Sequence, residues 1–97
     1  MRHFITVKFR PGITSEEKES MYPDIAEIFD GTRSIDGIHD VILHKNCTPR
    51  DNRYDIMIEM VMEKEALDAY DGCRWHLLWK EKYGGLIEKK AIFDCDD

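Results

Sequence analysis

Apolar and polar residues alternate near both ends of the chain, a spacing typical of β-strands with one buried face. The first such stretch covers residues 2–9 and ends at Pro11-Gly12. The second covers residues 86–94, where Ala91 and Phe93 alternate against Ile92. On the first strand, the face expected to be buried carries His3, Ile5, Val7 and Phe9.

Residues 14–30 repeat their apolar positions every three to four residues, which predicts an amphipathic helix. Thr14 followed by Glu17 is a capping-box pattern and marks the helix start. Pro23 lies inside the pattern, so we expect a kink or break just before it. Asp30-Gly31 predicts the helix end. The apolar stripe consists of Met21, Tyr22, Ile25, Ile28 and Phe29.

Two further strands are predicted over residues 38–45 and 53–62, and the segment 46–52 between them has the composition of a turn. A second helical region covers residues 64–83, with an interruption at Asp71-Gly72. The order β-α-β-β-α-β predicts an α+β, ferredoxin-like fold: a four-stranded antiparallel sheet with helices on one face. Residues 1–97 are expected to form a single domain.

The predicted third strand is apolar on both faces, which indicates a second cover for the sheet. Tyr54, Ile56, Ile58, Met60 and Met62 form one face, and Met57 and Val61 flank Glu59 on the other. The two helices can cover only one side of the sheet. We therefore expect a homodimer in which two copies join their open sheet faces.

Composition narrows the function classes. The formal net charge is −6, and no basic stripe exists to neutralise phosphates, so we expect no nucleic-acid partner. No apolar run is long enough to span a bilayer and no signal peptide is evident, so we expect a cytoplasmic protein without a membrane partner. Cys47, Cys73 and Cys95 are widely spaced, which favours free thiols.

The candidate chemistry centres on His76, Tyr70 and His3. His76 lies in an aromatic neighbourhood, where a neutral imidazole could serve as a general base. On an unbroken helix Tyr70 would diverge from His76, but a bend at Asp71-Gly72 could bring both to one cavity. The alternative is that each histidine is structural. No metal-binding spacing is present, so we expect neither a metal nor another cofactor.

The chain resembles the stress-responsive dimeric α/β-barrel family over nearly its full length. The similar stretches are residues 2–9, 35–38, 46–55, and 65–70 followed by His76. One plant member of that family is a polyketide cyclase, which closes a linear polyketide by an aldol-type step. Its catalytic histidine and tyrosine and a further histidine fall on His76, Tyr70 and His3. The family usually reads Tyr-x-x-His-Pro-x-His, whereas Cys73-Arg74 replaces His-Pro here.

The leading hypothesis is a dimer that binds a small apolar or aromatic ligand between helices and sheet, with acid–base chemistry of the cyclase or isomerase kind. His76 would be the base, Tyr70 a hydrogen-bond donor and His3 a polar partner. The alternative is a non-catalytic, stress-responsive oligomeric or ligand-sequestering protein. The residues expected to line the pocket are Tyr22, Ile25, Phe29 and Trp79.

Overall fold

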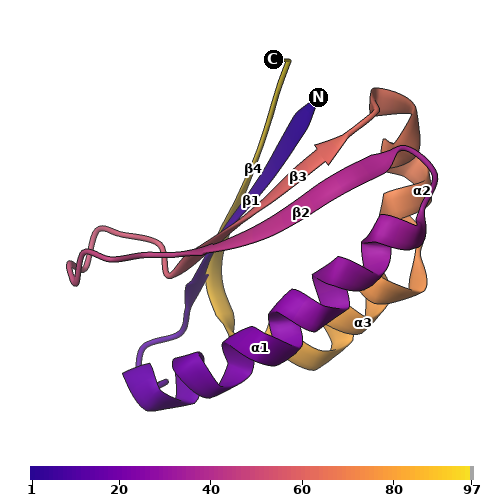
Figure 1. Cartoon of the computed structure of the whole chain (residues 1–97). Coiled ribbons are helices and arrows are strands. Elements are labelled where there is room, and N and C mark those ends of the chain that lie inside the picture. Colours follow the sequence, from indigo (N-terminus) through magenta and orange to yellow (C-terminus); the bar gives the residue numbers. More distant parts are fainter. Residues whose placement is uncertain (97) are drawn as a thin grey trace.

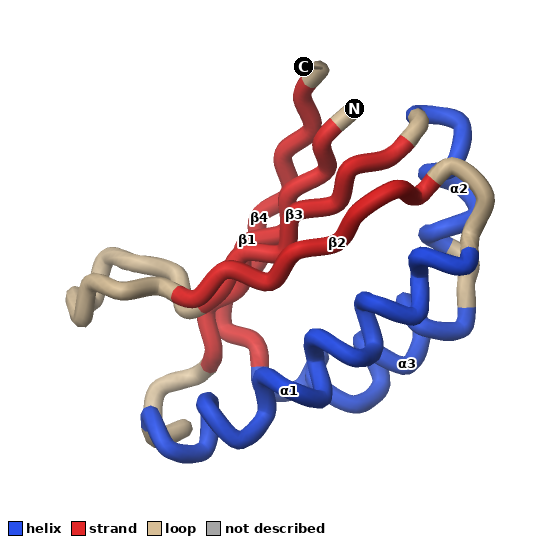
Figure 2. Tube along the Cα trace, in the orientation of Figure 1, coloured by secondary structure: helices blue, strands red, loops and turns tan. Residues whose placement is uncertain are grey.

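A computed structural model describes residues 1–96. Its four strands form one antiparallel sheet in the order β2-β3-β1-β4, and the helices pack on one face of that sheet (Figures 1 and 2). The predicted fold class is therefore confirmed. The elements are β1 (Arg2–Phe9), α1 (Ser15–Gly31), β2 (Ile38–Lys45), β3 (Ile56–Met62), α2 (Leu67–Asp71), α3 (Arg74–Tyr83) and β4 (Ile87–Cys95). None of the helices in this range has the length and apolarity needed to cross a bilayer.

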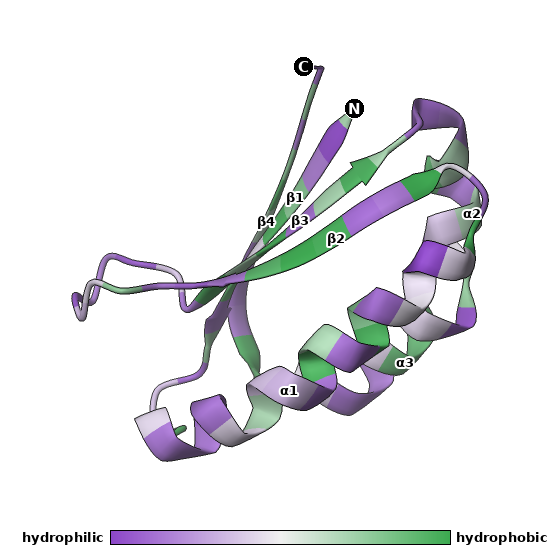
Figure 3. Ribbon diagram, viewed as in Figure 1, coloured by the Kyte–Doolittle hydropathy of each residue, from purple (hydrophilic) through white to green (hydrophobic). Residues whose placement is uncertain are grey.

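The core lies between the helices and the two central strands, β1 and β3. Alternate residues of these strands are buried, as the sequence pattern predicts. Trp79 of α3 packs edge-on against Phe29 of α1, with ring centroids 5.1 Å apart, and joins the two helices over the sheet. Figure 3 shows the hydrophobic positions of α1 turned toward the sheet and α3.

The helix α1 departs from the prediction at Pro23 but not at its start. Thr14 and Glu17 form the expected capping box, at 3.0 and 3.1 Å. The helix then continues through Pro23 without the expected break. Pro23 and Glu19, whose carbonyl loses its helical partner, are both exposed, so water can satisfy that carbonyl.

The third strand begins three residues later than predicted, at Ile56. Asp55 bends the chain there, because its carboxylate accepts hydrogen bonds from the backbone of Phe9 (2.7 Å) and from Lys18 (3.0 Å). Tyr54, predicted to lie on the buried face of the strand, is instead exposed in the loop. The interruption of the second helical region at residues 71–72 is confirmed, since α2 ends at Asp71 and α3 begins at Arg74.

The other face of the sheet has no cover within the described chain. Phe4 of β1 lies directly beside Phe93 of β4 on this face, with ring centroids 6.4 Å apart. Phe93 is 64% exposed. Glu59, also on this face, pairs with Arg2 (2.5 Å) and with His44 (2.9 Å).

Candidate functional site

Three side chains predicted to act together meet between β1 and the pair α2–α3. His3 alternates with the open-face residues of β1, so its ring enters the helix layer and is buried. Tyr70 lies near the end of α2 and His76 in the first turn of α3. The ring of Tyr70 lies 4.8 Å from that of His76 and 5.6 Å from that of His3, measured between centroids. Tyr70 thus contacts both imidazoles.

The break between α2 and α3 makes this meeting possible. Gly72 ends α2, and Cys73 takes an extended backbone conformation that redirects the chain. The sulfur of Cys73 accepts a hydrogen bond from the backbone N–H of His76 (3.4 Å), so Cys73 is the N-cap of α3.

The hydrogen bond of His76 fixes the form of its imidazole. Nδ1 lies 2.8 Å from the backbone carbonyl oxygen of Asp71. A carbonyl only accepts, so Nδ1 carries the proton and donates. In the neutral ring Nε2 then holds a lone pair, which is the form that a general base requires.

His3 has a partner that the sequence analysis missed. Its Nδ1 lies 2.5 Å from a carboxylate oxygen of Asp94 on β4. The two residues are directly paired across the β1–β4 ladder. A carboxylate at this position holds the ring orientation and favours a proton on Nδ1. Only the strand register could have revealed the pair, because 91 positions separate the two residues.

The hydroxyl of Tyr70 is buried and has no hydrogen-bond partner among residues 1–96. Burial raises the pKa of this phenol well above its usual value of 10, and the nearby Cys73 and Asp71 add to the effect. Tyr70 therefore stays protonated at neutral pH. It can donate a hydrogen bond to an oxygen of a ligand, and burial without a partner makes that bond more favourable.

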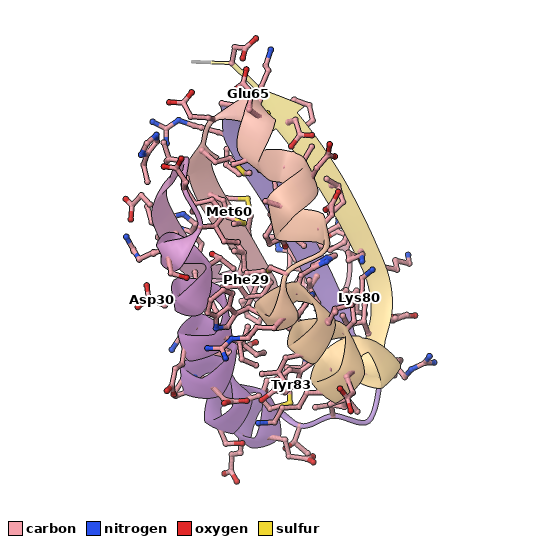
Figure 4. The ribbon with its side chains drawn as sticks, turned by 90° about the vertical axis from the view of Figure 1, so that its right-hand side faces the viewer. Phe29, Asp30, Met60, Glu65, Lys80 and Tyr83 are labelled. Carbon is pink, nitrogen blue, oxygen red and sulfur yellow. The ribbon has the colours of Figure 1, made fainter. Side chains whose placement is uncertain are left out.

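A cleft of about 290 Å³ opens on these residues between the helices and the β1–β4 side of the sheet. Figure 4 shows Lys80 on the side of α3 nearest to β4, at this cleft. Apolar side chains alternate with charged ones along the walls. The cleft is lined by His3, Ile5, Leu67, Tyr70, Asp71, His76, Trp79, Lys80, Lys90, Ile92 and Asp94.

Of the four residues predicted to line this cleft, only Trp79 does so. Ile25 and Phe29 are buried in the core, and Tyr22 lines a separate groove at the other end of β1. The reason is the position of α1, which packs against α3 and β2, away from the β1–β4 side. Its apolar stripe therefore fills the core rather than the cleft.

The remaining histidines lie away from the cleft. His39 pairs with Glu63 (3.1 Å) and His44 with Glu59 (2.9 Å), and both histidines are exposed. Within residues 1–96, no group of three or more His, Cys, Asp or Glu side chains is arranged to hold a metal ion. All three cysteines are free.

Comparison with known proteins identifies the family. The family model described as Stress Responsive A/B Barrel Domain, Dabb, matches residues 1–97. The chain belongs to this family. No curated protein matches it.

Solved structures share the fold of this Dabb domain. A dimeric protein of unknown function from Bacteroides fragilis, with a ferredoxin-like fold, superposes with a TM-score of 0.83 at 17% identity, over 99% of this chain and 94% of that one. A Dabb family protein from Mesorhizobium loti gives 0.75 at 17%, over 99% and 94%. An Arabidopsis thaliana protein gives 0.74 at 18%, over 99% and 93%.

Proposed function

We propose that this Dabb domain binds a small carbonyl-bearing ligand in the cleft and moves a proton on it. The proposal rests on one observation: the ring of Tyr70 contacts two imidazoles at the wall of a cleft, and its buried hydroxyl has no partner among residues 1–96. A buried donor without a partner costs stability, so its presence at the wall of a cleft favours a role in binding. The cleft suits a small apolar or aromatic molecule.

The proposed step is abstraction of a proton from the carbon next to a carbonyl group. Nε2 of His76 takes the proton, the electron pair of the broken C–H bond forms a C=C bond to the carbonyl carbon, and the π pair of the carbonyl moves to its oxygen to give an enolate. The hydroxyl of Tyr70 donates a hydrogen bond to that oxygen. His3, oriented by Asp94, supplies a second polar contact. The enolate can then be reprotonated or attack a second carbonyl, which are isomerase-like and cyclase-like outcomes respectively.

We further propose that two copies pair through the open sheet face. Phe4 and Phe93 form an exposed aromatic pair there, and Ile42 on the same face is also exposed. Glu59 forms an ion pair with Arg2 and a hydrogen bond with His44, so its charge is compensated by Arg2 before a second copy covers it. Several of the structural neighbours are described as dimeric. Sedimentation equilibrium should give twice the 11.5 kDa chain mass; a folded monomer at micromolar concentration would refute the pairing.

The catalytic proposal is tested by deuterium incorporation at the α-carbon of a panel of β-keto esters, followed by NMR in deuterated buffer. Wild type should exceed the buffer rate, and His76→Gln and Tyr70→Phe should each lower the excess by about 100-fold. His39→Gln is the matched control, because it removes an exposed histidine distant from the cleft. If all three variants exchange protons at the wild-type rate, His76 and Tyr70 are not catalytic.

A non-catalytic, ligand-sequestering role is the second candidate. The observation that favours it is that His76 and His3 each use one ring nitrogen in a contact within the protein. Thermal stabilisation by phenols and β-keto compounds separates the two candidates. Stabilisation that is lost in Tyr70→Phe, without any enzymatic deuterium exchange in wild type, would support sequestration.

A further inference from the structure

A second, larger depression of about 780 Å³ lies at the opposite end of β1 from the His76 cleft. We call it the loop groove. Its walls are the loop of residues 46–55, which projects beyond the sheet in Figure 1, and the beginning of α1. The end of β1 and Glu88 of β4 complete it. Figure 3 shows mostly hydrophilic colours along the loop.

The charge of the loop groove is opposite to that of the chain. Six of the chain's 14 lysines and arginines line it, against four of its 20 acidic residues, so the groove carries a formal charge of +2. The rest of the chain then carries −8, given the total of −6. The basic residues come from four separate segments that the fold brings together. They are Lys8, Arg10, Lys18, Lys45, Arg50 and Arg53.

Most of these cations have no carboxylate partner among the described residues, whereas two of the four carboxylates of the groove are already paired. Lys18 neutralises Asp55, and Lys45 neutralises Glu19, each at 3.0 Å. The other contacts involve only neutral oxygens: Lys8 with the backbone of Asp51, Arg10 with the backbone of Gly85, and Arg53 with the amide of Asn52. No ion pair is present for Arg50. Four cations of the groove therefore lack an ion-pair partner among the described residues, against two unpaired carboxylates, those of Asp51 and Glu88.

The floor of the loop groove is aromatic. Tyr22, which is 94% buried, lines it beside Phe9, with ring centroids 6.5 Å apart. The hydroxyl of Tyr22 makes no hydrogen bond within residues 1–96, although its ring is covered on one side by the ammonium of Lys45, 5.5 Å from the centroid. The Tyr22 hydroxyl, which has no hydrogen-bond partner among residues 1–96 and lines a groove of net positive charge, is an available donor for an anionic oxygen.

We infer that the loop groove is a second binding site, separate from the His76 cleft, for a phosphorylated small molecule that also carries an apolar ring. The guanidinium groups of Arg50 and Arg53 match phosphate oxygens in charge and planar geometry. Lys8 adds a point charge. Tyr22 and Phe9 are almost fully buried, so the apolar surface for the ring comes mainly from the more exposed Pro11, Ile13 and Pro49 of the lining. The volume suits a ligand of nucleotide size.

The test is a titration followed by amide NMR at low ionic strength, where surface charges are least screened. Inorganic phosphate and ADP serve as the two probes, in metal-free buffer. ADP should shift the amides of residues 8–22 and 46–55 and saturate at one molecule per chain. It should bind at least about tenfold more tightly than inorganic phosphate, because only ADP reaches the apolar surface. Equal affinities would refute the ring contact, and shifts confined to the His76 cleft would refute the site.

A charge-matched pair of variants separates a built site from general attraction. Arg50→Gln/Arg53→Gln should weaken ADP binding by about tenfold or more, since two charged hydrogen-bonding groups are lost. Lys64→Gln/Arg74→Gln removes the same charge near α2 and α3, far from the loop in Figure 1, and should change the affinity less than twofold. All four residues are exposed, so both variants should fold, as dispersed amide spectra would verify. Equal weakening in both variants would refute the inference.

Discussion

Replacing Tyr70 by phenylalanine removes a single oxygen atom, and the structure predicts that the protein becomes more stable. The hydroxyl is buried without a hydrogen-bond partner. An unsatisfied buried donor costs about 1–3 kcal/mol, so its removal should raise the free energy of unfolding by about 1 kcal/mol or more. For a domain of this size that corresponds to a rise in Tm of about 4–8 °C.

Tyr83→Phe is the matched control for this prediction. The hydroxyl of Tyr83 donates to a carboxylate oxygen of Asp24 at 2.5 Å. Burial and this contact raise its pKa to about 12. The same chemical change should therefore cost about 1 kcal/mol at this position. Urea unfolding at pH 7 measures both variants, at one fixed protein concentration because the proposed dimerisation would couple stability to concentration.

The two variants should shift the urea midpoint in opposite directions. Tyr70→Phe should also lower the deuterium exchange proposed for the cleft by about 100-fold, so a gain in stability would accompany a loss of function. If Tyr70→Phe lowers the midpoint as much as Tyr83→Phe does, the hydroxyl of Tyr70 has a structural partner. The argument for its role in binding would then fail.

Three further outcomes can be measured. The hydrogen bonds from His44 and Arg2 lower the pKa of Glu59 in the folded state, so the stabilising effect of its carboxylate is present above the usual pKa of 4.5 and is lost as pH falls below that value. The difference in urea midpoint between wild type and Glu59→Gln should therefore shrink from pH 7 to pH 3.5. A difference that stays constant would contradict this prediction. Gly31→Ala should destabilise the protein by about 1–3 kcal/mol, because the new Cβ would lie 2.1 Å from the indole of Trp75. In a Trp75→Ala background the same change should instead stabilise the protein by about 0.5 kcal/mol. Destabilisation in both backgrounds would exclude the clash with Trp75 as the cause. Asp94→Asn should leave the fold intact but lower the deuterium-exchange rate by about tenfold or more, and an unchanged rate would remove His3 from the proposed chemistry.

Features encoded over a few neighbouring residues could be predicted from the sequence. The capping box of Thr14 and Glu17 and the break after Asp71 each depend on local chemistry, and both are present. The alternation in β1 predicted correctly that His3 faces the helices. The meeting of Tyr70 with His76 was also within reach, because a helix interruption needs no distant partner.

Features that depend on how distant elements pack could not be predicted. The stripe of α1 showed that Ile25 and Phe29 are buried, but not that they face the core rather than the cleft. Gly31 has an ordinary helical backbone conformation, so only the approach of Trp75 explains the need for glycine. The partnership of His3 with Asp94 required the register of two strands from opposite ends of the chain.

That partnership also bears on the order in which the protein is made and folded. A ribosome synthesises Asp94 91 positions after His3, so the histidine stays without its carboxylate until β4 docks beside β1. Pairings this distant in sequence form late and slowly, because the intervening chain must be ordered first. A nascent or truncated chain without β4 would contain Tyr70 and His76, but its His3 would lack Asp94. Only chains in which β1 and β4 have paired would therefore have the complete cleft.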